Sequence, residues 1–293
     1  MTTLRSLLNE TRLPKNEARA VLAHLLDIHL QLPKSALLTH DGMELSDPFV
    51  AEWQLLEQRR LDGEPTAYLI GRRSFHAIEL MVGPGVLIPR PETELLVDLG
   101  LDELDRIINT ENASNESEHS LTMLDLGTGS GAIALAIAAS QPNVTIVATD
   151  ASQAALDIAE QNAAHLKLGD RVSFSLGNWY AALQSLDSTS RYFDLILSNP
   201  PYIKVGDPHL SKGDLRFEPQ SALTDFGSGL ICITAIIDGA LAHLKPGGLL
   251  AVEHGFDQSP PVLERLALAG FQDVRAHRDL AGHWRVASGR KSI

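Results

Sequence analysis

The sequence predicts an α/β protein whose main part is a mostly parallel, doubly wound sheet, with a smaller N-terminal helical domain joined to it by a β-hairpin linker. The chain has 293 residues, about twice the ~150 residues typical of one domain. Its N-terminal part has helical periodicity and no strand pattern, whereas short apolar strands alternate with helical segments after residue 120. We therefore expect residues 1–72 to form the helical domain and residues 73–293 the linker and the α/β domain.

Two helices stand out in the N-terminal part. The first follows a start signal at Pro14, and its apolar face comprises Val21, Leu22, Leu25, Leu26 and His29. The second begins at Ser46-Asp47-Pro48, where Asp47 can cap free N–H groups and Pro48 suits the first helical position, and it should run to about Leu61. Because no catalytic constellation is visible in this part, we expect a packing or recognition module.

The linker and the next helix have different patterns. Residues 71–89 are β-branched and aromatic, punctuated by Gly83-Pro84-Gly85, which predicts a hairpin. A helix should follow, because Leu95, Leu96, Leu99 and Leu104 form an apolar stripe. The segment Asn109–Ser120 is almost without apolar residues and is expected to be a solvated loop.

The remaining chain contains the strands of the predicted sheet. They are expected at Thr122–Leu126, Thr145–Asp150, Val172–Leu176, Phe193–Ser198 and Gly248–Glu253. In open parallel sheets, ligands bind beyond the carboxyl ends of the strands, near the point where the strand order reverses. The residues directly after these strands are therefore the candidates for chemistry.

Composition excludes several classes of protein. With 44% hydrophobic and 21% charged residues the chain is typical of a globular protein, and 24 basic against 37 acidic side chains give a net charge of -13. That charge argues against a broad nucleic-acid-binding face. Neither a signal peptide nor an apolar run of ~18 residues is present, so we expect a cytoplasmic protein without membrane contact.

Cysteine and histidine usage argues against disulfide and metal chemistry. The single cysteine, Cys232, is expected to be a buried, inert thiol. The eleven histidines show no metal-ligand spacing, so no metal site is predicted.

A glycine turn after the first strand predicts a nucleoside site. Gly127, Gly129 and Gly131 separate the strand MLDL from an alanine-rich helix, which would bring backbone N–H groups close to a ligand. Asp150 ends the next strand, where its carboxylate could accept hydrogen bonds from ribose hydroxyls. After the third strand, Gly177-Asn178-Trp179-Tyr180 could flank an adenine ring, although core packing competes for the aromatic residues.

The fourth strand ends in Asn199-Pro200-Pro201-Tyr202. Two prolines remove two N–H donors, so the carbonyl groups of this turn are free to accept hydrogen bonds. A planar amide or amino group could donate its two hydrogens to the Asn199 side-chain oxygen and the Pro200 carbonyl, while Tyr202 stacks on it and excludes water. A methylsulfonium donor would supply the reactive carbon, so the turn predicts methyl transfer to nitrogen.

Taken together these segments resemble a known family. The sequences GTGSG (127–131) and NPPY (199–202), with Asp150, are similar to class I S-adenosylmethionine-dependent amino-methyltransferases. LIPRPETE (87–94) and RFEP (216–219) resemble the PrmC/HemK family of peptide chain release factor N5-glutamine methyltransferases, over nearly the whole chain. The resemblance implies a class I methyltransferase-like fold, S-adenosyl-L-methionine as cofactor, and the glutamine of the Gly-Gly-Gln motif of class 1 release factors as substrate, with the N-terminal domain helping to dock that protein.

The resemblance also implies roles for individual residues. Cofactor contacts are expected from Gly127, Thr128, Gly129, Ser130, Gly131, Asp150, Asn178, Trp179 and Asn199, and substrate contacts from Asn199, Pro200, Pro201 and Tyr202, of which Asn199, Pro200 and Tyr202 are the catalytic candidates. The sequence departs from the family in three places: Asn178 replaces the usual Asp, Ser228 replaces a common acidic residue, and Phe75-His76-Ala77 differs from an aromatic-glycine run.

Two other functions remain open at this point. The NPPY acceptors would also suit the amino group of adenine, so N6-adenine methylation of nucleic acid is an alternative, which the acidic composition disfavours. A non-catalytic adaptor that binds the release factor is the other, which the intact Asn199 and the glycine turn disfavour.

Overall fold

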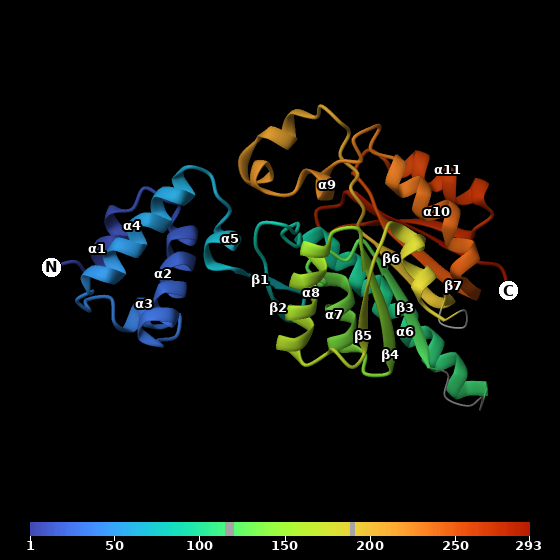
Figure 1. Ribbon diagram of the computed structural model, residues 1–293, viewed down its shortest axis with the longest axis horizontal. Helices are drawn as coiled ribbons and strands as arrows, with labels where there is room; N and C mark the ends of the chain where they lie inside the picture. Colours follow the sequence, from blue (N-terminus) through green and yellow to red (C-terminus); the bar gives the residue numbers. More distant parts are fainter. Residues whose placement is uncertain (115–119, 188–190) are drawn as a thin grey trace. The chain divides into compact units, whose positions relative to one another are not determined.

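The computed structural model describes residues 1–114, 120–187 and 191–293, and these form two compact units (Figure 1). The first comprises Met1–Arg72 with Lys212–Phe217, and the second comprises Arg73–Ser211 with Glu218–Ile293. The short segment 212–217, which the sequence placed in the second domain, thus groups with the first unit. There Asp214 lies 3.3 Å from the guanidinium of Arg60.

The first unit is helical. Its helices are α1 (Leu4–Glu10), α2 (Lys15–Leu30), α3 (Ala36–Thr39), α4 (Asp47–Leu61) and α5 (Thr66–Ile70), with the 3-10 turn η5 (Gly213–Phe217). Both expected helices are present. Two details of the prediction were wrong: His29 lies outside the buried face and bonds to Glu52 instead, and Asp47 is the first helical residue rather than the cap.

The hairpin consists of β1 (Arg72–Phe75) and β2 (Ile78–Met81), and its turn lies at His76-Ala77, before Gly83-Pro84-Gly85. Helix α6 (Glu94–Ser114) follows, so the expected loop at Asn109 is wrong as far as Ser114, and residues 115–119 lie outside the described part. Ile107 and Ile108, directly before the polar segment, still pack against the core and anchor the helix there.

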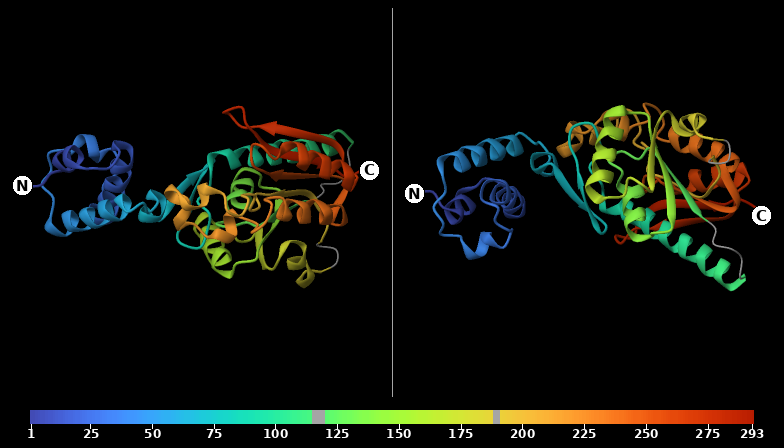
Figure 2. Two further views of the ribbon diagram at one scale, coloured as in Figure 1. Left: turned by 90° about the horizontal axis from the view of Figure 1, so that it is seen from above. Right: turned by 60° about the horizontal axis from the view of Figure 1, so that its bottom comes forward.

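The second unit contains a seven-stranded sheet in the order β5-β4-β3-β6-β7-β9-β8. The strands are β3 (Leu121–Leu126), β4 (Val144–Asp150), β5 (Val172–Leu176), β6 (Phe193–Ser198), β7 (Leu244–Glu253), β8 (Gln272–Arg278) and β9 (Trp284–Arg290). The first five are parallel and match the predicted strands, whereas the antiparallel pair β8 and β9, seen at the red end of the chain in Figure 2, was not predicted.

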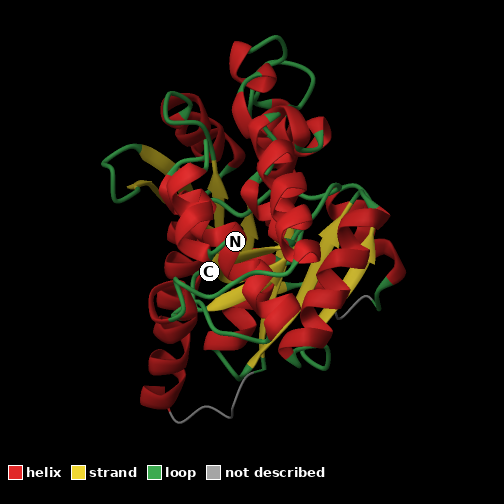
Figure 3. Cartoon of the chain, turned by 90° about the vertical axis from the view of Figure 1, so that its left-hand side faces the viewer, coloured by secondary structure: helices red, strands yellow, loops and turns green. Residues whose placement is uncertain are grey.

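Helices cover both faces of this sheet (Figure 3), so the predicted doubly wound α/β architecture is confirmed. One face packs against α6, α7 (Ala132–Ser140) and α8 (Gln153–Leu166), and the other against α10 (Ile231–His243) and α11 (Ser259–Ala269). The short elements are η1 (Pro91–Thr93), η2 (Trp179–Ser185), η4 (Pro208–Ser211) and α9 (Gln220–Leu223). Cys232, expected to be buried, is only half-buried on α10.

None of the helices in the described ranges combines the length and the apolarity that a membrane span requires.

Candidate active site

The parallel register brings the predicted site residues to one edge of the sheet. Leu126 at the end of β3 pairs with Thr149 of β4 and with Ser198 of β6, and Ser198 pairs with Val252 of β7. The residues that follow these positions therefore emerge side by side, where β3 has β4 on one side and β6 on the other. This is the point at which the strand order reverses, and it is the expected ligand position in such sheets.

The glycine turn provides room for a ligand but few free donors. Gly127, Gly129 and Gly131 have φ angles of 74°, 57° and 84°, which residues with a Cβ rarely adopt. The N–H groups of Gly127 and Thr128 both donate to the Thr149 carbonyl at 2.9 Å, and that of Gly131 donates to the Thr128 carbonyl. The expectation that these N–H groups face a ligand was therefore wrong for these three residues, because strand β4 and the turn itself accept their hydrogen bonds.

The space beside Gly129 is open. A Cβ built on Gly129 would meet nothing within 4 Å, whereas one on Gly131 would lie 2.8 Å from Leu135 Cδ1. The backbone angle favours glycine at both positions, and at 131 the contact with Leu135 adds to that preference.

Asp150 lies across the turn with both carboxylate oxygens in use. Its Oδ2 accepts from the Gly129 N–H and its Oδ1 from the Ser152 N–H, both at 2.9 Å. Burial raises the pKa of this carboxyl group, while these backbone hydrogen bonds oppose the rise. Each oxygen retains a second lone pair, so the group can still accept hydrogen bonds from two hydroxyls of a ligand.

A second carboxylate beneath the turn was not singled out from the sequence. Asp125 is fully buried on β3 and accepts hydrogen bonds from the Thr128 hydroxyl at 2.7 Å and the Ala134 N–H at 3.2 Å. Burial raises its pKa to about 7. The signal was present in the sequence, since an acidic residue interrupts the apolar strand MLDL. Thr128 consequently directs its side chain into the protein, not toward a ligand.

Asn162 of α8 connects the turn to the hairpin. Its buried side chain accepts from the Met81 N–H at 2.7 Å and donates to the carbonyls of Met81 and Ser130. Nothing in the local sequence pattern indicates this role, because Met81 and Ser130 lie far from Asn162 in the chain.

The two aromatic residues after β5 lie in different places, Trp179 at the site and Tyr180 in the core. Trp179 has a positive φ of 46°, and its ring lies over the glycine turn, 3.4 Å from the position of a Cβ on Gly127. Exposed Asn178 directly precedes it. Tyr180 instead stacks on His243 with ring centroids 4.7 Å apart and donates to the Ile236 carbonyl, so the expectation that it flanks a ligand was wrong.

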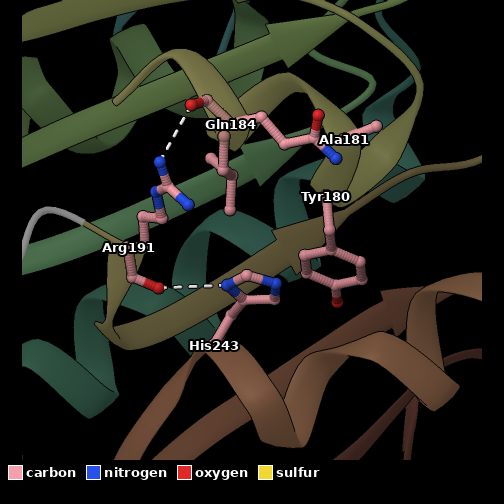
Figure 4. Close-up of a pocket in the computed structure, with 6 residues that line it drawn as sticks. Tyr180, Ala181, Gln184, Arg191 and His243 are labelled. Carbon is pink, nitrogen blue, oxygen red and sulfur yellow. Dashed lines mark hydrogen bonds between the residues drawn. The ribbon is translucent and has the colours of Figure 1, made fainter. Parts of the chain in front are cut away.

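The pocket around Tyr180 is separate from this edge of the sheet (Figure 4). Arg191 donates to the carbonyls of Gln184 and Leu186, and the Arg191 carbonyl is bonded to the His243 ring. The polar groups of this pocket are thus hydrogen-bonded to other groups of the protein, which indicates a structural cluster.

The turn after β6 has the acceptors that the sequence predicts. The Asn199 Nδ2 donates to the Thr93 hydroxyl at 3.0 Å, which leaves the Asn199 Oδ1 on the other side of the amide. Among the described residues no backbone N–H donates to the Pro200 carbonyl. The Tyr202 carbonyl, in contrast, accepts from Gln258 at 2.9 Å, so it is not available.

Tyr202 is partly buried against the core on the α10 side, and its hydroxyl donates to Glu253 Oε1 at 3.1 Å. Glu253 ends β7 with an exposed fraction of 1%, and burial raises its pKa to about 7, while the nearby hydroxyl groups of Thr93 and Tyr202 oppose the rise. In the described part of the chain its Oε2 has no hydrogen-bond partner. Sequence analysis did not single out Glu253 or Thr93.

Two family segments fix the position of Thr93. Fully buried Glu218, from RFEP, accepts from the Ile88 N–H at 2.9 Å and forms an ion pair with Arg90, both of which belong to LIPRPETE. Thr93 follows three residues later in η1, and it is 3% exposed. These segments therefore hold Thr93 against Asn199.

The site can hold a nucleoside-based sulfonium cofactor. The open side of Gly129, the indole ring of Trp179 and the remaining lone pairs of Asp150 offer space, a stacking surface and hydroxyl acceptors at the same edge of the sheet. No cluster of His, Cys, Asp or Glu side chains that could hold a metal ion occurs within residues 1–114, 120–187 and 191–293.

Comparisons with known proteins agree with this geometry. A family described as "Methyltransferase domain" matches residues 117–278, and one described as "PrmC N-terminal domain" matches residues 1–71. The crystal structure of a methyltransferase from Pyrococcus furiosus has the same fold, with a TM-score of 0.51 and 18% identity over 81% of this chain and 98% of that one. The fold and the site thus define a class I, S-adenosyl-L-methionine-dependent methyltransferase.

Relatives identify the family within this class. The release factor glutamine methyltransferase of Bordetella pertussis is 44% identical over 289 residues, 99% of each chain. That of Neisseria gonorrhoeae is 46% identical over 281 residues, 96% of this chain and 94% of the relative. The chain belongs to the release factor glutamine methyltransferase family.

Proposed function

We propose that the protein transfers a methyl group from S-adenosyl-L-methionine to the N5 nitrogen of the glutamine in the Gly-Gly-Gln motif of class 1 peptide chain release factors, in the cytoplasm. The observation that carries this proposal is that the NPPY turn keeps two hydrogen-bond acceptors available. The Asn199 amide is held through its Nδ2, so its Oδ1 and the Pro200 carbonyl remain as two acceptors next to the glycine turn.

A carboxamide is the group that two such acceptors fit, because its nitrogen carries two hydrogens. With both hydrogens bound, the nitrogen is held in one orientation toward the glycine turn. When bound, the cofactor supplies an electrophilic methyl carbon. Well-oriented reactants gain ~7–11 kcal/mol relative to free encounter, so the chain's contribution is mainly positioning. Tyr202 covers the turn from the core side and limits access of water.

The cofactor contacts proposed here follow the geometry. Asp150 accepts hydrogen bonds from the ribose, Trp179 and Asn178 flank the base, and the backbone of residues 127–131 lets the cofactor approach closely. Asn199 borders both ligands, and Pro201 keeps the turn rigid.

A methylation assay with a mutated substrate tests this function. The protein is incubated with S-adenosyl-L-methionine labelled in its methyl group and with a class 1 release factor, and label in the factor is counted. We expect strong labelling of the natural factor and background labelling when its Gly-Gly-Gln glutamine is replaced by alanine. Equal labelling of the two factors would contradict the proposal.

The same assay separates the two alternatives. Label in DNA or RNA in place of the release factor would support adenine methylation, which the net charge of -13 disfavours. Binding of the factor without any labelling would support an adaptor.

A further inference from the structure

The side chain of Asn162 joins the glycine turn to the end of the hairpin through three hydrogen bonds. Its Oδ1 accepts from the Met81 N–H at 2.7 Å, and its Nδ2 donates to the Met81 carbonyl at 3.0 Å and to the Ser130 carbonyl at 2.9 Å. Met81 is the last residue of β2, and Ser130 belongs to the glycine turn. One amide group thus uses its oxygen and both of its hydrogens on these two backbone segments.

The glycine turn depends on this contact to keep a single shape. The peptide group between Ser130 and Gly131 is followed by a glycine with φ of 84°, and a glycine backbone permits many other angles. The N–H of this peptide donates to the Thr128 carbonyl within the turn, whereas its carbonyl oxygen is held by Asn162. Because Ser130 and Asn162 are both buried, loss of the second bond would leave a polar atom without a partner.

The end of the hairpin also depends on Asn162 for its position. Phe75 and Leu80 anchor the hairpin in the apolar core. Apolar contacts are non-directional, so they hold the hairpin on the domain without fixing where Met81 lies along it. Hydrogen bonds to both the N–H and the carbonyl of Met81 do fix this position, as a neighbouring strand would. Asn162 therefore sets the distance between the end of β2 and the glycine turn.

We propose that Asn162 is a positioning residue for the cofactor: it braces the Ser130–Gly131 peptide against β2 and so keeps the glycine turn in the shape that binds S-adenosyl-L-methionine. Asn162 acts through the backbone of the turn, because both of its amide hydrogens are already used by Met81 and Ser130. The open side of Gly129, one residue away from Ser130, is where this shape matters. The inference rests on the part of the proposed function that places the cofactor at this turn.

Two substitutions of Asn162 separate hydrogen bonding from packing. Asn162→Leu has a similar shape but no polar group, and we expect its affinity for S-adenosyl-L-methionine, measured by isothermal calorimetry, to fall about tenfold or more. Asn162→Ala opens a space bounded by two carbonyls and one N–H, where a water molecule can replace the lost bonds, so it should lose less affinity than the leucine variant. A packing role predicts the opposite order, because leucine fills space that alanine leaves empty.

Gln141→Met is the matched control, because it also replaces a buried side-chain amide by an apolar group of similar size. Gln141 follows the C-terminal end of α7, opposite the end at the glycine turn, and its Nε2 donates to Asp105 at 3.0 Å. Both Gln141→Met and Asn162→Leu should lower the melting temperature, and only Asn162→Leu should weaken cofactor binding by the folded protein. Affinity within about twofold of the wild type in Asn162→Leu, an equal loss in both variants, or a greater loss in Asn162→Ala than in Asn162→Leu would overturn the proposal.

A third variant keeps the test available should the leucine variant fail to fold. Asn162→Asp retains the shape and the acceptor for the Met81 N–H, but when ionised it has no hydrogen to donate to the two carbonyls. We expect it to fold and to lose about tenfold or more in cofactor affinity, and wild-type affinity in this variant would contradict the proposal.

Hydrogen exchange gives a readout that does not depend on the cofactor. The Met81 N–H, which donates to Asn162, should exchange several-fold faster in Asn162→Leu and at the wild-type rate in Gln141→Met. Unchanged exchange in Asn162→Leu would contradict the hydrogen bond on which the inference depends. Should the wild type bind the cofactor without labelling the release factor, the proposed function fails, whereas the affinities of these variants still test the role of Asn162.

Discussion

A single methyl group on the glycine turn tests whether the open space beside Gly129 is the cofactor site. Gly129 has φ of 57°, and a Cβ there would meet no atom of the protein within 4 Å. The substitution Gly129→Ala therefore costs only backbone strain, roughly 1–2 kcal/mol for a left-handed residue with a Cβ. We expect a modest loss of thermal stability, of about 2–8 °C for a domain of this size.

The same methyl group would occupy space that a bound cofactor needs. We expect the affinity of Gly129→Ala for S-adenosyl-L-methionine, measured by isothermal calorimetry, to fall about tenfold or more, since tenfold corresponds to only ~1.4 kcal/mol. Gly282→Ala is the matched control: Gly282 lies between β8 and β9 with φ of 85°, and a Cβ there also meets nothing within 4 Å.

Both variants should lose similar stability, and only Gly129→Ala should lose cofactor affinity. A Gly129→Ala protein that is destabilised like its control and still binds the cofactor with wild-type affinity would refute the placement of the cofactor at this turn.

Two further predictions concern the carboxylates of the site. Burial raises the pKa of Glu253 from 4.5 to about 7, so the folded chain binds this proton more tightly than the unfolded chain, and the Glu253 contribution to stability falls as pH rises between these values. Relative to Glu253→Gln, the unfolding free energy of the wild type should decline by up to about 3 kcal/mol from pH 4.5 to 7, measured by urea unfolding, and a constant difference would contradict this. Glu218→Ala leaves the Ile88 N–H and Arg90 without their buried partner, so we expect a stability loss of roughly 3 kcal/mol. The double variant with Arg90→Ala should lose less than the sum of the single variants, and additive losses would argue against the pairing.

Local sequence patterns predicted the elements that have a buried, regular face. The five parallel strands were found because each is a short apolar run, and α2 and α4 because their start signals and periodicity agree. Strand β8 was missed because it lies at the sheet edge, where QDVRAHR is largely exposed and has no continuous apolar run.

The parts of the site that directly follow a strand in the sequence were predicted. The NPPY turn and the glycine turn each follow directly from a strand end, so their positions could be derived from the sequence. Thr93, Asn162 and Glu253 could not be derived in this way. Each makes its defining hydrogen bonds to residues at least thirty positions away, and such contacts depend on tertiary structure.

The glycine turn shows a second limit of sequence analysis. Three glycines after a strand correctly predicted an unusual backbone, with positive φ at Gly127, Gly129 and Gly131. The same pattern wrongly predicted free N–H donors, because the Thr149 carbonyl on the neighbouring strand accepts two of these N–H groups. A backbone donor is free only if no strand or loop nearby uses it, which the local sequence does not encode.

The most direct test of the central claim is a separation of transfer from cofactor binding in Asn199→Ala. The variant removes the acceptor Oδ1 while leaving Asp150, Trp179 and the glycine turn intact. Single-turnover transfer of labelled methyl to a class 1 release factor should fall on the order of a hundredfold, as is common when one preorganised hydrogen-bonding group is removed. The calorimetric affinity for S-adenosyl-L-methionine should remain within about threefold of the wild type. Wild-type transfer, or a loss accounted for entirely by weaker cofactor binding, would contradict the assignment of Asn199 to the substrate amide.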